Sequence, residues 1–265
     1  MLELYHNGSS TCSTKVRIVL AEKNIEWKGH FLNLRAGDAQ APAYLKLNPN
    51  GVVPTLLVDG QPIIESTIIC EYLDDAYPHN PLKPASAFDI ARMRLWMRQL
   101  DDNVHAATST VSSAIAFRHQ HLCKSPEDYE AYFARIPDPV RREKKRRTIE
   151  EGMDHPAFGP AVRRFAKLIA DMDSALAHTS FLAAETYSLA DVAYTAYMNR
   201  LEHLGMNDMI NARPRVADWA KRLCERPTYQ GAVKDWEPPE YLAIYARTQE
   251  EARVRVGRIL AGPAG

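Results

Sequence analysis

The sequence predicts an α/β domain with a mixed four-stranded sheet, followed by an all-helical domain. Three observations support this prediction. Strand and helix patterns alternate as far as Tyr77, the prolines Pro78, Pro81 and Pro84 follow, and no strand pattern appears after them. Alternation of short apolar runs with amphipathic helices is typical of a sheet covered by helices. A group of prolines between periodic segments marks a linker between two domains.

The first domain is expected to have the order β-α-β-α-β-β-α. In its first helix, Val16, Val19 and Leu20 recur at helical spacing. The expected elements are strand Leu2–Tyr5, a helix from Ser13 to about Lys23, strand Trp27–Leu34, a short irregular helix Ala41–Leu47, strand Thr55–Val58, a second hairpin strand and helix Ser66–Tyr77.

The stretch Asn48–Ser66 organises this domain. Pro54 opens a strand, because a proline has no N–H to give to a ladder and belongs at a strand's beginning. The Val53–Pro54 bond is a candidate cis peptide, since only bonds to proline reach the cis form at low cost. The Asp59-Gly60 pair predicts a tight hairpin. Ser66 is a suitable N-cap for the helix that follows.

The second domain is expected to consist of helices only. Its first helix runs from Ser86 to about Phe117 and carries an apolar stripe at helical spacing. Ser188 and Asp191 have the spacing of a capping box at a later helix start. The other expected helices are a piece from Pro126 that ends at Pro137-Asp138-Pro139, the charged segment Val140–Glu151, Phe158–Ala177, Val216–Glu225 and an amphipathic tail Pro238–Gly265 with a frayed end. We divide the chain into a first domain (1–78), a linker (79–85), a helical domain (86–240) and a C-terminal tail (241–265).

Composition excludes several classes of partner. Lysine and arginine total 33, as do aspartate and glutamate, so the charge indicates neither nucleic acid nor an anionic membrane. The basic run Arg141–Arg147 contains an acid and is interpreted as a solvated helix face. No apolar run reaches the ~18 residues of a spanning helix, and a strand-like start argues against a signal peptide. The four cysteines lack metal-site or disulfide spacing. We expect a cytoplasmic protein with reduced cysteines and no metal.

Four motifs occur in order along the chain. They are Asn48-Pro49-Asn50-Gly51-Val52-Val53-Pro54, Glu65-Ser66, Ser188-Leu189-Ala190-Asp191 and Arg226-Pro227-Thr228-Tyr229. Together with the linker, this pattern resembles the cytosolic glutathione transferase superfamily over roughly residues 2–235. The resemblance implies a thioredoxin-like first domain that binds glutathione as cosubstrate. Three stretches also resemble the bacterial branch that cleaves β-aryl ethers: Glu65–Leu73, Arg135–Pro139 with its charged sequel, and the long insert between the first helices of the second domain.

The resemblance assigns the γ-glutamyl group of glutathione to Glu65 and Ser66. A helix N-terminus favours a carboxylate because its amides are free, and Glu65 would hold the ammonium group. The main chain at Val53-Pro54 would pair with the cysteinyl backbone like an added strand. Gln40 stands where many relatives have a lysine, and its amide could donate to the glycyl carboxylate. By analogy, Asp101 is expected to contact the γ-glutamyl amine of the partner subunit in a homodimer.

The sulfur of glutathione is expected at the turn Ser9–Ser13. A hydroxyl at a helix N-terminus would stabilise a thiolate through a charge-assisted hydrogen bond. Counted back from the following helix, Ser13 falls on the serine of the ether-cleaving branch, and Ser10 falls on the position that many other classes use. Each serine could also serve only as a helix cap. We rank Ser13 first, Ser10 second and Cys12 third.

The sequence therefore predicts a glutathione transferase whose thiolate attacks a hydrophobic electrophile, aromatic or an aryl ether, bound between the domains. Two alternatives remain open. Cys12 at a helix N-terminus would be a good nucleophile, so the protein could be a thiol reductase that forms a mixed disulfide with glutathione. Cys12 lacks the following proline that is common in those classes. The second alternative is a non-catalytic interaction module that keeps only the fold.

Overall fold

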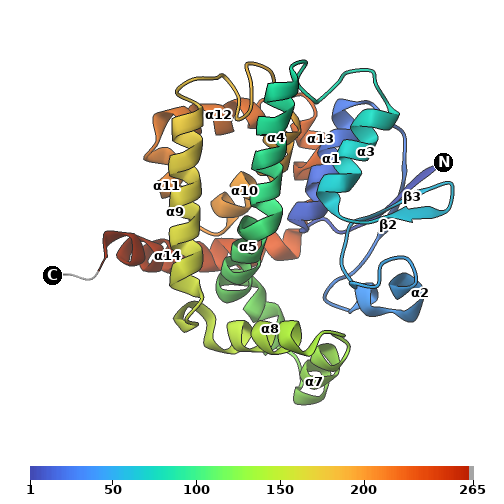
Figure 1. Ribbon diagram of the computed structural model, residues 1–265. Coiled ribbons are helices and arrows are strands. Elements are labelled where there is room, and N and C mark those ends of the chain that lie inside the picture. The colour runs from blue at the N-terminus through green and yellow to red at the C-terminus, as the bar shows by residue number, and fades with distance from the viewer. Residues whose placement is uncertain (263–265) are drawn as a thin grey trace.

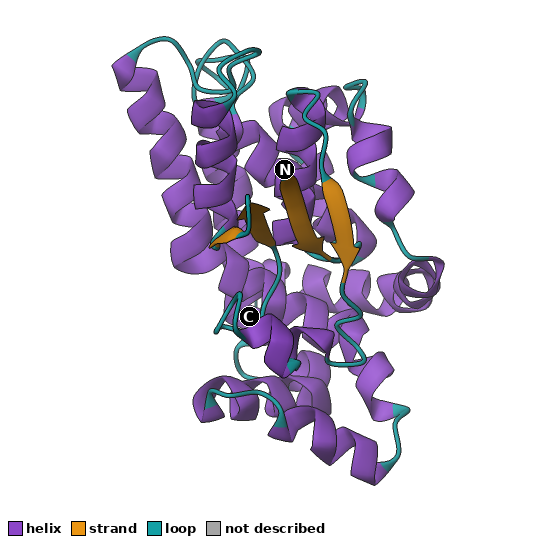
Figure 2. Cartoon of the chain, turned by 90° about the vertical axis from the view of Figure 1, so that its right-hand side faces the viewer, coloured by secondary structure: helices purple, strands orange, loops and turns teal. Residues whose placement is uncertain are grey.

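The computed structural model describes residues 1–262 and confirms a thioredoxin-like first part with a mixed four-stranded sheet. Its elements are strands β1 (Leu2–His6), β2 (Lys28–Phe31), β3 (Thr55–Val58) and β4 (Gln61–Ile63), helices α1 (Thr11–Glu22), α2 (Pro42–Leu45) and α3 (Ser66–Ala76), and the 3-10 turn η1 (Asp38–Gln40). The strand order is β2-β1-β3-β4, with β2 parallel to β1 and the other pairs antiparallel. Figure 2 shows these short strands among the surrounding helices.

The second part is helical, as expected. Its α-helices are α4 (Ala87–Gln99), α5 (His105–Ser112), α6 (Arg118–Leu122), α7 (Pro126–Ala134), α8 (Pro139–Glu151), α9 (Phe158–Ala175), α10 (Leu189–His203), α11 (Asp208–Asn211), α12 (Pro214–Cys224), α13 (Tyr229–Ala232) and α14 (Pro239–Ala261). Short 3-10 turns are η4 (Gly152–Asp154) and η5 (Lys234–Trp236). The frayed end expected after α14 falls on residues 263–265, outside the described residues.

Two boundaries differ from expectation. Helix α1 begins at Thr11 rather than near Ser13, because the Ser10 hydroxyl caps the helix and accepts a hydrogen bond from the Ser13 amide at 3.2 Å. The long helix expected from Ser86 is interrupted by two π-helical turns, η2 (Leu100–Val104) and η3 (Ser113–Phe117). The capping box at α10 is confirmed, because the Asp191 carboxylate accepts a hydrogen bond from the Ser188 amide at 2.9 Å.

One hydrophobic core joins the two parts of the chain. Leu4, Val16 and Leu20 of the first part belong to the same buried cluster as Tyr194 and Trp219 of the second. Helix α1 packs against α3 on its own domain and against α10 across the boundary (Figure 1). The N-terminus of α1 therefore lies where residues of both parts meet. Within residues 1–262, no helix is long and apolar enough to cross a membrane.

Helices α7 and α8 form a lobe that projects beside α2 in Figure 1. This lobe has its own small core of Tyr132, Phe133, Ile136 and Ile149. Two arginines attach it to loops of the first part. Arg135 Nη1 donates to the Ala36 carbonyl at 3.1 Å, and Arg141 Nη1 donates to the Asn50 carbonyl at 3.0 Å. Arg141 of the basic run 141–147 therefore anchors the lobe. Arg142 and Arg146 bond within the lobe, to the Ile136 carbonyl and to Glu130, so the solvated helix face is limited to the exposed positions 143, 144 and 147.

Candidate functional site

The N-terminus of α3 is left without a side-chain cap. Its N-cap residue, Glu65, is exposed and has φ 69°, and its side chain makes no capping hydrogen bond. A positive φ is uncommon for a residue with a side chain, and such conformations gather at functional sites. Ser66 follows at the first helical position and is buried. Amides of the first helical turn are therefore available to a ligand.

The Val53–Pro54 bond is cis, as the sequence suggested. Val53 precedes β3, and the hydroxyl of Tyr44 and the amide of Asn48 both donate to the carbonyl of Val52, at 2.6 Å and 2.9 Å. Within residues 1–262, neither the amide nor the carbonyl of Val53 forms a hydrogen bond. The loop is thus held by its neighbours while the main chain of Val53 stays unpaired.

Gln40 and Asp101 each have a partner in the structure. Gln40 Nε2 donates to the Gly51 carbonyl at 2.9 Å, which leaves this side chain holding the Val53 loop. Asp101 is exposed and accepts a hydrogen bond from the Thr67 hydroxyl at 2.6 Å, so it lies beside the start of α3. The binding roles expected for these two residues remain predictions.

The three residues ranked for the sulfur have different surroundings. Ser13 has no exposed surface, and its hydroxyl lies 3.4 Å from the Asn7 amide, which donates to it. Ser10 is half-buried, and its oxygen accepts from the Ser13 amide, so its own proton is free to donate. Cys12 is also half-buried. The geometry therefore favours Ser10 and Cys12 over Ser13 for contact with a ligand.

Cys12 lies at a charged junction between the two parts. Its Sγ is 3.6 Å from Nδ1 of His105, and the same nitrogen is 3.0 Å from the hydroxyl of buried Tyr197. Burial raises the pKa of the Cys12 thiol, but the charges of Lys15 and His105 outweigh it, and with a hydrogen bond from Ser66 they bring the pKa to about 6. The negative sulfur in turn raises the pKa of His105. This pairing favours a thiolate at neutral pH.

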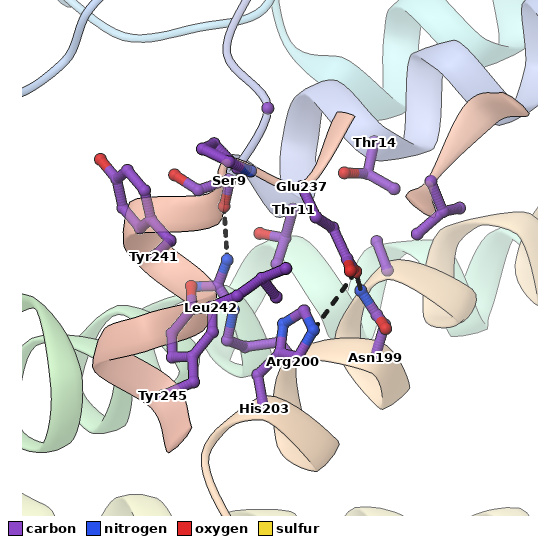
Figure 3. Close-up of a pocket in the computed structure, with 14 residues that line it drawn as sticks. Ser9, Thr11, Thr14, Asn199, Arg200, His203, Glu237, Tyr241, Leu242 and Tyr245 are labelled. Carbon is purple, nitrogen blue, oxygen red and sulfur yellow. Dashed lines mark hydrogen bonds and ion pairs between the residues drawn. The ribbon is translucent and has the colours of Figure 1, made fainter. Parts of the chain in front are cut away.

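A pocket opens on the other side of the α1 N-terminus (Figure 3). It holds about 350 Å³ of empty space, part of it open to solvent, and most of that space is narrow. Ser9, Thr11 and Thr14 line it from the first part; Asn199, Arg200, His203, Glu237, Tyr241 and Tyr245 line it from the second. Within the described residues, Cys12 is not part of this lining. Ser10, the N-cap of α1, adjoins the lining residues Ser9 and Thr11 in the chain.

Sequence reasoning missed several of these neighbours. The sequence assigns no catalytic role to His105, and it does not single out Lys15, Tyr197 or Arg200. A signal existed for Lys15, because it follows Cys12 by three positions on one helix and so shares its face. No local pattern connects Cys12 to His105 or Tyr197, which come from α5 and α10.

Comparison with known proteins agrees with this architecture. The family model described as Glutathione S-transferase, N-terminal domain, matches residues 9–76. Protein LigF of Sphingobium sp. (strain NBRC 103272 / SYK-6) is 31% identical over 233 residues, which are 85% of this chain and 90% of LigF. Glutathione S-transferase F13 of Arabidopsis thaliana is 30% identical and covers 86% of this chain and 93% of its own length. The chain belongs to the glutathione S-transferase family, whose cosubstrate is glutathione.

Solved structures add a more specific likeness. The crystal structure of the beta-etherase LigF from Sphingobium sp. strain SYK-6 matches with a TM-score of 0.81 at 29% identity, over 88% of this chain and 99% of that one. Glutathione transferase F7 from Populus trichocarpa matches with a TM-score of 0.70 at 22% identity, over 90% of this chain and 100% of that one, and shows the shared fold. The protein is thus a glutathione transferase by family, and it is similar to a beta-etherase.

Proposed function

We propose that this glutathione transferase cleaves β-aryl ethers or displaces a leaving group from a related aromatic electrophile. The observation that carries the proposal is the position of Ser10. It caps α1 and is flanked in the chain by Ser9 and Thr11, which both line the pocket. An extended thiol bound along Val53 would present its sulfur to the Ser10 hydroxyl at the edge of that pocket. Similarity to the beta-etherase LigF supports the choice of an ether.

The proposed binding roles follow the free groups of the site. The uncapped amides and the hydroxyl of Ser66 would take the γ-glutamyl carboxylate, Glu65 its ammonium group, and the Val53 main chain the cysteinyl backbone. The sulfur would be stabilised as a thiolate by Ser10 and by the N-terminus of α1. The thiolate attacks the carbon that bears the aryl ether, a carbon–sulfur bond forms, and the carbon–oxygen bond breaks. The phenolate leaves with the bonding electrons and takes a proton from solvent.

Cys12 supports a second candidate function, because its pKa is about 6 and His105 lies beside it. As a reductase, the Cys12 thiolate would attack a mixed disulfide of glutathione and release the other thiol. Glutathione thiolate would then displace Cys12, form oxidised glutathione and regenerate the enzyme. The two functions therefore require different residues of the same turn.

Product analysis separates the candidates. Glutathione is incubated with a β-aryl ether, a haloarene and a glutathione mixed disulfide, and products are identified by mass spectrometry. For ether cleavage we expect a thioether and a free phenol, a strong decrease in Ser10→Ala, and little change in Cys12→Ala. Loss of activity toward the disulfide in Cys12→Ala, with Ser10→Ala and Ser13→Ala active, would establish the reductase. Failure of glutathione to raise the thermal stability of the protein would favour a non-catalytic module.

The protein is also proposed to form a homodimer through α3 and α4. These helices expose three large apolar side chains, Ile68 (57%), Phe88 (74%) and Leu95 (69%). If they gather in one apolar patch, that patch would mark a protein interface. Light scattering should give twice the chain mass of 29.9 kDa, and Phe88→Asp should return the protein to the monomer mass. A monomeric wild-type protein would disprove the dimer.

A further inference from the structure

Arg200 is a buried cation that its own chain does not neutralise. Arg200 is only 5% exposed. One terminal nitrogen donates to the Ser112 hydroxyl at 3.1 Å and the other to the Ser9 carbonyl, but Nε has no partner. Within residues 1–262, no carboxylate forms an ion pair with Arg200. Burying a charge is costly unless it is paired, so an anion beside Nε would stabilise this site.

A second unsatisfied donor lies against the same guanidinium. The Tyr245 hydroxyl is buried and has no hydrogen-bond partner, and its ring centroid is 5.6 Å from the Arg200 Cζ. The aromatic face of Phe117, 5.0 Å from that carbon, completes the surroundings. Arg200 and Tyr245 both line the pocket beside Ser9 and Thr11 (Figure 3). The pocket therefore offers two polar donors within an aromatic wall.

The acid of the pocket does not compete for this position. Glu237 accepts hydrogen bonds from Asn199 at 2.8 Å and pairs with His203 at 3.2 Å, and Figure 3 shows it turned toward those two residues. Burial raises the pKa of Glu237, but the hydrogen bonds from His203 and Asn199 bring it to about 2. Its charge is thus held by Asn199 and His203.

A purely structural role for Arg200 would not explain the unpaired donors, Arg200 Nε and the Tyr245 hydroxyl. Arg17 is an example of an arginine with a purely structural role. It is also buried, but every nitrogen of its guanidinium has a partner, and most of these partners are carbonyls: Ala232, Asn7 and Gly8. Arg17 does not line the pocket within the described residues. Arg200 donates to the Ser9 carbonyl and the Ser112 hydroxyl, and its Nε has no partner.

We propose that this pocket recognises a carboxylate on the second substrate, so that the transferase selects acidic aromatic electrophiles. Arg200 Nε and the Tyr245 hydroxyl would donate to the carboxylate, while the ring lies beside Tyr241 and Leu242, which also line the pocket. The Leu242 side chain is 38% exposed, so its displacement would widen the narrow pocket for a ring at little cost in packing. This inference rests on the proposed transfer of glutathione to an aromatic substrate.

The test uses two haloarenes that differ only in charge, a chloronitrobenzoate and the corresponding chloronitrobenzamide. Glutathione displaces chloride from both. We expect wild-type protein to favour the benzoate in kcat/KM, after correction for the uncatalysed rates. Arg200→Met should lower kcat/KM for the benzoate by about tenfold or more, since a hydrogen bond to a charged group is lost, and should change that for the benzamide far less. Tyr245→Phe should have a smaller effect in the same direction, and Arg200→Lys should retain part of the preference.

Arg17→Lys is the matched control, because it alters a buried arginine that contacts only the chain itself. It should leave the benzoate preference intact. The ratio of kcat/KM for the benzoate to kcat/KM for the benzamide is compared between the proteins. If it is the same in wild type, Arg200→Met and Tyr245→Phe, the carboxylate site is disproved. Absence of turnover with either substrate would refute the proposed transfer instead. In that case calorimetry with nitrobenzoate and nitrobenzamide still decides the site: saturable binding of the benzoate alone, lost in Arg200→Met, supports it, and its absence refutes it.

Discussion

Two helix N-termini face the candidate site, and they are built differently. The start of α1 is closed by its own chain, because Ser10 caps it with a hydrogen bond to the Ser13 amide. The start of α3 has no such cap, since Glu65 turns its backbone to φ 69° and makes no capping bond. Both have free amides of the first turn, but only α3 leaves them without a side-chain acceptor. The comparison suggests that α3 recognises a ligand carboxylate, while α1 orients the reacting groups.

Residues at both N-termini affect the pKa of Cys12. This residue belongs to the first turn of α1, yet the Ser66 hydroxyl of α3 contributes to its low pKa. Charges from Lys15 and His105 act on the same sulfur. The charges that lower the pKa of Cys12 therefore act at the first turn of α1. Substitutions at the two N-termini should separate binding from reactivity.

The largest effect is expected for Ser66→Ala on glutathione affinity. A hydrogen bond to a charged group contributes about 1.5–3 kcal/mol, so the dissociation constant should rise about 10- to 150-fold. Isothermal titration calorimetry with glutathione measures this change. Ser86→Ala is the matched control, because it removes the capping serine of α4 outside the site. Unchanged glutathione affinity in Ser66→Ala would show that the Ser66 hydroxyl does not bind the γ-glutamyl carboxylate.

A smaller effect is expected when the charge near Cys12 is removed. Alkylation of Cys12 by iodoacetamide should follow a titration with its midpoint near pH 6, because only the thiolate reacts. Lys15→Met should raise that midpoint and slow alkylation at pH 7 by up to about tenfold, as the pKa returns toward the ordinary value of about 8.5. Peptide mass spectrometry resolves the cysteines, and exposed Cys123 serves as the internal reference. A wild-type midpoint above pH 8 would contradict the ion pair with His105.

Local patterns explain why so much of the fold was predictable. The Asp59-Gly60 hairpin, the cis Val53–Pro54 bond and the Asp191 capping box all depend on residues within a few positions of each other. Such short-range rules can be read directly from a sequence. The same holds for the prolines that precede α4. The element order and the change from sheet to helices were therefore accessible.

The site was less predictable because its partners meet only in three dimensions. His105 reaches Cys12 across 93 positions. It also follows the π-helical turn η2, whose wider turn shifts the phase of a helical pattern. Likewise, Ser13 and Ser10 look equivalent as cap residues in the sequence, and only packing shows that Ser13 is fully buried.

The smallest effect concerns stability and distinguishes the two N-termini directly. Ser10→Ala removes the cap of α1 and should lower the free energy of unfolding by about 1 kcal/mol. Ser66→Ala should lower it much less, because α3 has no side-chain cap to lose. Urea unfolding followed by circular dichroism compares both with wild type, without glutathione. Equal destabilisation by the two substitutions would show that Ser66 also supports its helix. A clear difference would mean that α3 leaves its first turn open for a ligand, at little cost to the fold.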